Sequence, residues 1–411
     1  MCRWITLISS ESVSLSDIVL APSNSLVKLS RDASFHPGAD FINNAHMNGD
    51  GFGVGWYHTN AAIRPAPDVD VDCCAVSNHS SSNTNASTNT NTNDSSNGRS
   101  GTENCTCTTK AAVFKDISPA WNNENLREIC LATNSNCIMA HVRAASKNTG
   151  ISHPNCHPFK AGRLLFCHNG RIDQFASIRR RFLEQVTDEA FEKIRGTTES
   201  ECIFALFLTN LEEDDFAEGS PYSQTRPFGA KRLVAALKRT LHQIENFLEE
   251  LGLTEGYSTF NFSVTDGDTM VVTRFCDKNP DIPPPSLYFA FGTAKHLYNE
   301  LTNENGPLLS TTARISTEDS DKEESSSVDS DQSDSSTSNY DEKAIHLEGH
   351  ESRPGKVLVD VDPTTASFIV ASNPLTKTHT WHPMPRNSIM WCTRGKHPEL
   401  RLLRRRSSIL P

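Results

Sequence analysis

The sequence predicts an α+β fold, in which helices pack on antiparallel or mixed β-sheets. Three observations favour this class. Short apolar runs rich in β-branched residues recur along the chain, as is typical of buried strands. Two helical segments lie together in the middle of the sequence, between runs of strands. An Asp-Gly pair separates two of the strand-like runs, which is the signature of an antiparallel hairpin.

The expected strands share one pattern, a mainly apolar run that ends at a polar or glycine-rich segment. Asp266-Gly267 provides the turn of the hairpin. The runs are Arg3–Ile8, Phe52–Tyr57, Cys137–Arg143, Leu164–His168, Phe260–Thr265, Thr269–Phe275, Ser286–Phe291, Lys356–Asp360 and Ser367–Ala371.

Two segments have helical patterns. Glu199–Asn210 is almost wholly apolar after its first residues, so we expect a buried helix. Ala230–Leu251 carries apolar residues three and four positions apart with charged residues between them, which predicts an amphipathic surface helix. Thr198 and Glu201 have the spacing of a capping box at the start of the first helix.

Polar residues are concentrated in two segments of this 411-residue chain, whose hydrophobic share is only 36%. Residues 76–109 consist mainly of Asn, Ser and Thr, and residues 316–343 hold ten acidic residues and two lysines. Neither segment can bury enough apolar area to offset the entropy lost on ordering. The sequence therefore predicts one domain over residues 2–392, interrupted by two disordered insertions and followed by a basic tail at residues 393–411.

Charge and hydropathy exclude several classes of protein. A net charge of −11 argues against general nucleic-acid binding, which needs clustered Lys and Arg. No apolar run approaches the ~18 residues of a membrane span. The N-terminal apolar run is short for a secretory signal, so we expect a cytoplasmic protein with reduced cysteines. The cysteine pairs around the first insertion lack the spacing of zinc ligands, and we expect neither a metal nor a cofactor.

Cys2 is the first candidate for chemistry. Removal of Met1 would make it the N-terminal residue, which joins a nucleophilic thiol to an α-amine. Because such an amine has a pKa of about 8, it can act as a base near neutral pH without a histidine. A cysteine in the second position also occurs without any catalytic role.

Three further positions carry groups suited to a small polar substrate. Arg143 ends a strand and could hold a carboxylate in its guanidinium fork or take part in an ordinary ion pair. Asn169 and Gly170 could form an oxyanion hole or an ordinary Asn-Gly turn. Glu199, at the start of the buried helix, could meet a substrate ammonium group.

Together, and in this order, these pieces resemble one family, the class II glutamine amidotransferases, which are N-terminal-nucleophile hydrolases. The motifs are MCR at residues 1–3, NGDGFG at 48–53, AHVRA at 140–144, NCHPF at 155–159 and HNG at 168–170. Within the family the sequence is most similar to a short subgroup. It includes bacterial γ-glutamyl hydrolases and the amidotransferase-like subunit of the fungal glutathione-degrading complex, which Pro119–Asn123 and Thr265–Gly267 also resemble.

The resemblance implies a four-layer αββα sandwich and a role for each candidate. Cys2 would be the nucleophile with its own amine as base, and Arg143 would bind the α-carboxylate of the substrate. Asn169 and Gly170 would form the oxyanion hole. Glu199 stands where the family usually has Asp against the substrate α-amine, so the charge is kept on a longer side chain.

A second departure from the family concerns a strand end. The family pattern Ala-Ser-Glu-Pro is Ala371-Ser-Asn-Pro374 in this chain. The missing carboxylate affects a contact behind the site and leaves the nucleophile in place.

The resemblance implies a γ-glutamyl hydrolase that cleaves the γ-glutamyl bond of glutathione through a thioester on Cys2, with a peptidase-like protein as partner subunit. Two alternatives stay open. The chain could be a glutaminase subunit that delivers ammonia to a separate synthetase, since the sequence contains no recognisable acceptor domain. It could also be a regulatory scaffold without turnover. Cys2, Arg143 and Asn169-Gly170 argue against the scaffold, whereas Glu199 mildly favours it.

Overall fold

The computed structural model describes most of the chain outside the two polar segments. The described residues are 2–32, 47–58, 110–146, 149–212, 220–253, 256–277, 284–293, 297, 314–316, 355–358, 362–376 and 381–403. Residues 76–109 and 317–343 lie outside them, so the disorder expected for the two insertions stays a prediction. Among the described helices, none combines the length and apolar character that crossing a bilayer requires.

The first sheet has the strand order β13-β9-β12-β1-β4-β2-β3, seven strands among the described residues, and its neighbours pair antiparallel. Strands β1 and β4 lie at its centre, so both their edges are hydrogen-bonded. The strands are β1 (Arg3–Ser14), β2 (Phe52–Tyr57), β3 (Ala111–Asp116), β4 (Asn134–Val142), β9 (Tyr288–Thr293), β12 (Ala366–Ala371) and β13 (His382–Pro383).

The second sheet has the order β10-β11-β15-β14-β8-β7-β6-β5, eight strands in the part of the chain that is described, again with antiparallel neighbours. The predicted Asp-Gly hairpin is confirmed as β7 and β8. The strands are β5 (Phe159–Ala161), β6 (Leu164–Arg171), β7 (Thr259–Thr265), β8 (Thr269–Cys276), β10 (Arg314–Ser316), β11 (Gly355–Leu358), β14 (Ser388–Thr393) and β15 (Glu399–Leu402).

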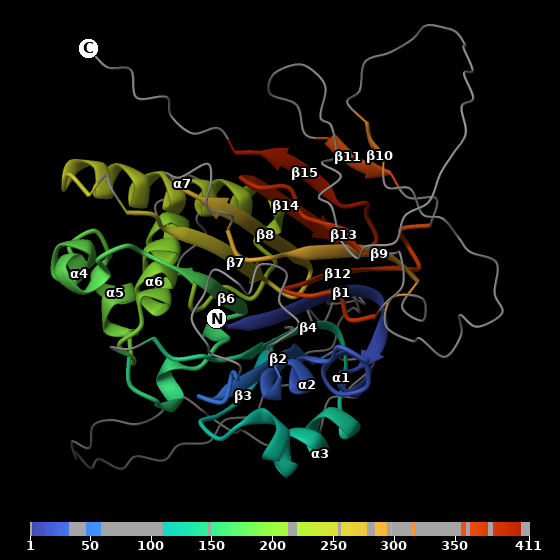
Figure 1. Cartoon of the computed structure of the whole chain (residues 1–411). Coiled ribbons are helices and arrows are strands. Elements are labelled where there is room, and N and C mark those ends of the chain that lie inside the picture. Colours follow the sequence, from blue (N-terminus) through green and yellow to red (C-terminus); the bar gives the residue numbers. More distant parts are fainter. Residues whose placement is uncertain are drawn as a thin grey trace, which may run out of the picture. The chain divides into compact units, whose positions relative to one another are not determined.

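Helices cover the outer face of each sheet (Figure 1). The first sheet carries α1 (Leu15–Val19), α2 (Leu26–Arg31) and α3 (Glu124–Ala132). The second carries α4 (Phe175–Leu183), α5 (Asp188–Glu192), α6 (Glu199–Glu212) and α7 (Gly229–Glu250). The two helices expected from the sequence are α6, which is buried along its length, and α7, which buries one face.

Three apolar cores separate the four layers. Alternate residues of a strand point to opposite faces. Trp4 and Ile8 of β1 therefore enter the core between the sheets, while Ile5 and Leu7 pack towards α1–α3. On β6, Leu165 and Cys167 likewise face the other sheet, and Leu164 and Phe166 face the helices. Because both faces are buried, these strands are continuously apolar, and the expected αββα sandwich is confirmed.

The structure differs from the sequence-based strands in several boundaries and adds strands such as β3, β5 and β14, and two differences change the interpretation most. β1 continues to Ser14, past the predicted end at Ile8, through a register irregularity against β4. β15 lies within the predicted tail at residues 393–411, where it pairs with β14 and buries Leu400. The domain therefore extends beyond residue 392, because pairing and side-chain burial offset the cost of ordering this basic segment.

Candidate active site

Cys2 directly precedes β1, a central strand of the first sheet. The antiparallel register pairs Arg3 with Val142, which brings Cys2 to the residues that follow β4. Its Sγ is 3.4 Å from the backbone nitrogen and 3.6 Å from the carbonyl oxygen of Ala144. Cys2 is half-buried, whereas the other described cysteines are buried. It is thus the accessible thiol of the described residues.

Arg143 is held from one side. Its Nη2 donates to the hydroxyl of Thr149 at 3.2 Å and to the carbonyl oxygen of Gly150 at 3.0 Å. Its Nη1 is buried and has no hydrogen-bond partner among the described residues. Burying donors of a cationic group without acceptors is unfavourable. The guanidinium is therefore fixed in place with donors left for another group.

The NGDGFG segment holds the end of β4 through its backbone. Asp50 accepts from the backbone nitrogen of Ala145 at 2.7 Å, and its own N–H donates to the carbonyl of Arg143 at 3.1 Å. Gly51 accepts from the N–H of Arg143 at 2.8 Å. Gly51 has φ +111°, and a Cβ there would lie 2.7 Å from the sulfur of Cys156, so only glycine fits.

Asn169 and Gly170 lie inside β6, opposite Asn261 and Phe260 of β7, and not in a turn. The ordinary Asn-Gly turn is therefore wrong for this pair. A Cβ on Gly170 would overlap the carbonyl oxygen of Thr259, which explains the glycine. Asn169 is 3% exposed, and its Nδ2 has no hydrogen-bond partner in the described part of the chain.

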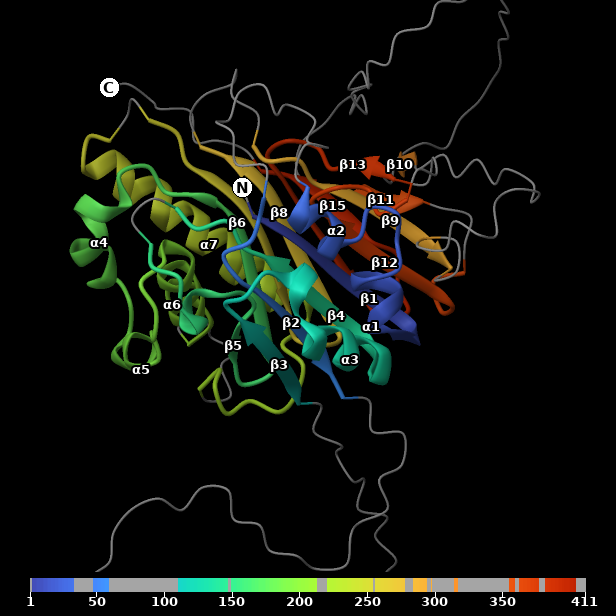
Figure 2. The ribbon, with the colours of Figure 1, turned by 60° about the horizontal axis from the view of Figure 1, so that its bottom comes forward.

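Strand β6 contacts β1 and β4 across the layer between the sheets. Figures 1 and 2 show the N-terminus beside β6 from two directions. The nucleophile candidate and the oxyanion-hole candidates therefore come from facing strands of different sheets.

Glu199 is the first residue of α6 and lies against the segment that leaves β6. Its Oε2 accepts from the backbone nitrogen of Ile172 at 3.3 Å. Burial raises the pKa of the Glu199 carboxyl to about 7, while the Ile172 N–H and the charge of Arg171 oppose that rise. The carboxyl thus changes charge close to neutral pH.

Glu201 has a different role from its neighbour. Its N–H donates to the hydroxyl of Thr198 at 3.3 Å, which confirms the N-cap half of the predicted capping box. Its carboxylate accepts from the backbone nitrogens of Arg195 at 3.0 Å and Gly196 at 2.6 Å. The Glu201 carboxylate therefore stabilises the turn before α6. Of these two glutamates, Glu199 is the one that lies beside β6.

Asn155 connects the two parts of the site. Its Nδ2 donates to the carbonyl of Gly150 at 2.8 Å, the same oxygen that Arg143 contacts. Its Oδ1 accepts from the backbone nitrogen of Thr197 at 2.8 Å, just before α6. The only signal of this role in the sequence was its place in the NCHPF motif.

The histidines near the site are buried and neutral. His141 and His157 have ring centroids 4.2 Å apart. Burial, with a smaller contribution from Arg143, lowers the pKa of His141 to about 3. His168 contacts the Ser200 hydroxyl and the Thr259 carbonyl, and burial lowers its pKa to about 4. Since these rings stay uncharged at neutral pH, they fit a structural role better than that of a titrating base.

The segment Ala371–Pro374, where Asn373 replaces the glutamate of the family pattern, lies beside β1. Ser372 donates its N–H to the carbonyl of Trp4 at 3.0 Å, and its Oγ accepts from the N–H of Trp4 at 3.1 Å.

Over the described ranges, no group of three or more His, Cys, Asp and Glu side chains is arranged to hold a metal ion.

Comparison with known proteins identifies the family. The protein "Probable glutamine amidotransferase DUG3" of Saccharomyces cerevisiae is 32% identical over 297 residues, which cover 72% of this chain and 69% of that protein. The chain belongs to the class II glutamine amidotransferases. The family model described as "Glutamine amidotransferases class-II" matches residues 105–282 of this amidotransferase, a segment that contains Arg143, Asn169, Gly170 and Glu199. The resemblance drawn from the motifs is confirmed.

Two solved structures are similar to this amidotransferase over nearly their whole length. A class II domain protein from Silicibacter pomeroyi has 16% sequence identity and a TM-score of 0.45, covering 97% of this chain and 98% of that one. A "predicted glutamine amidotransferase" from Pseudomonas aeruginosa has 13% identity and a TM-score of 0.41, covering 96% of this chain and 99% of that one.

Proposed function

We propose that this class II glutamine amidotransferase hydrolyses γ-glutamyl bonds through a thioester on Cys2. The observation that carries the proposal is the position of the Cys2 thiol against Ala144, the residue after Arg143. Within the described part of the chain, Nη1 of Arg143 and Nδ2 of Asn169 have no hydrogen-bond partner, which supports the proposal, because a bound γ-glutamyl group supplies acceptors for both.

Substrate recognition follows from the charges. The Nη1 donors of Arg143 bind the α-carboxylate of the glutamyl group, and the Glu199 carboxylate accepts from its α-ammonium. Both contacts are to atoms that do not react, so they orient the γ-carbonyl towards Cys2. Thr149 and Gly150 keep the Arg143 fork in one orientation.

The reaction then proceeds in two steps. The free α-amine of Cys2 takes the thiol proton, and the sulfur adds to the γ-carbonyl carbon. Asn169 and Gly170 donate to the oxyanion. The ammonium returns its proton to the leaving nitrogen as the C–N bond breaks and a thioester remains. Water, deprotonated by the amine, attacks the thioester and releases glutamate and the thiol.

We propose glutathione as the substrate and a peptidase-like subunit as the partner, in the cytoplasm. This rests on the resemblance of Pro119–Asn123 and Thr265–Gly267 to the subunit of the fungal glutathione-degrading complex. In the structure Asn123 caps α3 and Asp266 accepts from the N–H of Thr269 in the β7–β8 turn, so both motifs have local structural roles.

Glutamate release tests the proposal. Glutathione and glutamine are supplied in turn, with and without the co-purified partner, to wild type, Cys2→Ala and the matched control Cys130→Ala, which changes a buried thiol on α3. We expect release from glutathione with the partner, a loss of at least about 10³-fold in Cys2→Ala, and activity near wild type in Cys130→Ala. Intact-mass measurement should show that Met1 is absent.

The outcomes separate the alternatives. Ammonia release from glutamine alone supports the glutaminase subunit, and no release under any condition supports the scaffold. Full activity in Cys2→Ala, or in protein that retains Met1, contradicts the thioester mechanism.

A further inference from the structure

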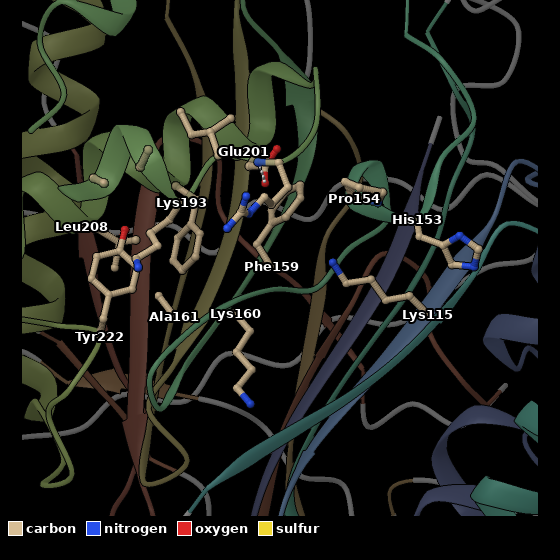
Figure 3. A pocket seen from close by; sticks show the side chains of 15 residues that line it. Lys115, His153, Pro154, Phe159, Lys160, Ala161, Lys193, Glu201, Leu208 and Tyr222 are labelled. Carbon is tan, nitrogen blue, oxygen red and sulfur yellow. Dashed lines mark hydrogen bonds between the residues drawn. The ribbon is translucent and has the colours of Figure 1, made fainter. Parts of the chain in front are cut away.

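A cavity of about 310 Å³ lies between β5, α5 and the first half of α6 (Figure 3). Cys2, Arg143, Asn169, Gly170 and Glu199 are not among the residues that line it. Its volume is in the range of sites for small molecules, about 300–1,000 Å³. It is therefore a second concave site, separate from the candidate glutamyl site.

The floor of the cavity is apolar. Phe159, Phe204 and Leu208 line it and are otherwise buried in the protein. The rings of Phe159 and Phe204 are stacked with centroids 6.4 Å apart. Flat apolar groups pack favourably against such a surface.

The rim of the cavity is cationic. Lys115, Lys160, Lys193 and Arg195 all contribute to its lining. In Figure 3, Lys115 and Lys193 extend from opposite sides. Their ammonium groups lie over rings, 5.1 Å from the centroid of Phe159 and 5.6 Å from that of Tyr222.

Among the residues that the structure describes, the acidic group in the lining is Glu201. Its carboxylate is already bonded to the backbone nitrogens of Arg195 and Gly196, so it offsets these cations little. Burial lowers the pKa of Lys115 through desolvation, against opposing contributions from Cys156 and Glu201. An anion in the cavity would offset that desolvation.

Tyr222 gives an independent indication of a ligand. Its hydroxyl oxygen is buried and has no hydrogen-bond partner among the described residues, although the residue lines the cavity. Burial raises the pKa of the phenol, so the group remains a neutral donor. A polar ligand atom would satisfy it.

We propose that this cavity binds a small organic anion, with a ring-sized apolar body on Phe159 and Phe204 and a carboxylate, sulfonate or phosphate group among the four cations. The site stands apart from the proposed hydrolysis, because its recognition elements are not those of a glutamyl group. The cavity is nevertheless close to the glutamyl site, since His153 and Pro154 in its lining directly precede Asn155.

Fluorescence titration with 1-anilinonaphthalene-8-sulfonate tests the proposal on the full-length protein. This probe joins an anionic group to an apolar aromatic body, and N-phenyl-1-naphthylamine is its uncharged counterpart. The variants are Lys193→Glu and Lys160→Glu, both at exposed positions of the rim. Arg127→Glu, at an exposed position on α3 over the other sheet, is the matched control. Thermal melting confirms that each variant is folded.

We expect saturable binding of one equivalent of the anionic probe, at least about tenfold weaker in both rim variants and unchanged in Arg127→Glu. The uncharged probe should bind at least about tenfold more weakly. Equal affinity in folded Lys193→Glu and wild type, or equal affinity for the two probes, would overturn the proposal. So would displacement of the probe by saturating glutathione, which would assign the fluorescence to the glutamyl site. None of these readouts depends on turnover, so the proposed hydrolysis can fail without affecting them.

Discussion

The two parts of the candidate site are built differently. Where β4 ends, backbone hydrogen bonds link Arg143 to Gly51 and Asp50, and a carboxylate fixes Ala145. Where β6 ends, the side-chain Nδ2 of Asn169 has no hydrogen-bond partner among the described residues, and the carboxyl of Glu199 accepts one backbone N–H. The backbone around the nucleophile is thus fixed by the protein itself, while the side chains of Arg143, Asn169 and Glu199 keep bonding capacity for a substrate.

This difference indicates that one set of groups positions the nucleophile and another binds the substrate. A nucleophile must be positioned before the substrate arrives, and backbone hydrogen bonds do this without using its reactive groups. Groups that bind substrate charge are most useful when their bonds are made only in the complex. Variants of the two parts should therefore change different kinetic constants.

After Cys2→Ala, the largest effect should come from removing the side-chain amide of Asn169. Asn169→Ala should lower kcat by about 10²–10³-fold with a small change in KM, because the donor acts mainly on the oxyanion. Steady-state kinetics measures the split. Asn136→Ala is the matched control, since it removes a buried asparagine whose Nδ2 bonds the carbonyls of Ser9 and Ser10. It should lower thermal stability and leave kcat near wild type. Equal kcat values for the two variants would contradict the assignment.

The guanidinium fork should affect binding more than turnover. Arg143→Lys keeps the charge but cannot contact Thr149, Gly150 and a carboxylate together. We expect KM to rise by about 10–100-fold, with a smaller change in kcat. A fall in kcat at constant KM would show that Arg143 acts on the reacting atoms and not on the α-carboxylate.

Weakening the hydrogen bond by which Asp50 holds the residues after β4 should have an intermediate effect on kcat/KM. Asp50→Asn weakens the bond to the Ala145 N–H, because a neutral acceptor replaces a charged one. We expect kcat/KM to fall by about tenfold, together with a stability loss of about 1–2 kcal/mol measured by urea unfolding. Unchanged stability with lost activity would place Asp50 in the chemistry itself.

The smallest effect concerns the pH dependence of stability. The pKa of Glu199 is raised to about 7 in the folded protein, so the unfolded chain loses this proton at lower pH than the folded one. Stability should therefore fall as the pH rises from about 4.5 to 7 and change little above that through this group.

Glu199→Gln removes this pH dependence. The variant should be more stable than wild type at pH 8, by at most about 3 kcal/mol, and equally stable near pH 4. Thermal melting at several pH values measures the difference. The same variant should lose the rise of kcat/KM near pH 7, since the ammonium contact needs the ionised form. A gain in stability that is the same at pH 4 and pH 8 would contradict the raised pKa.

Many strands and both long helices could be predicted from the sequence, because their burial produces local patterns of apolar residues. Strands buried on both faces are continuously apolar, and α6 and α7 show their burial in their residue spacing. The short helices were missed, since α1 and α2 have too few residues for a periodic pattern and depend on the capping residues Ser14 and Ser25. β15 was missed because its basic residues resemble a tail until pairing buries Leu400.

By itself, the sequence determined the α+β class, the order of the motifs and the family to which they belong. The catalytic and binding roles of Cys2, Arg143, Asn169, Gly170 and Glu199 remain proposals drawn from that pattern. Only the tertiary structure decided which polar atoms are left unpartnered, why Glu199 rather than Glu201 lies beside β6, and that a cationic cavity exists near Phe159. The physical reason is that burial and hydrogen-bond partners depend on residues distant in the chain, as Cys2 and Ala144 are, and local patterns do not record such contacts.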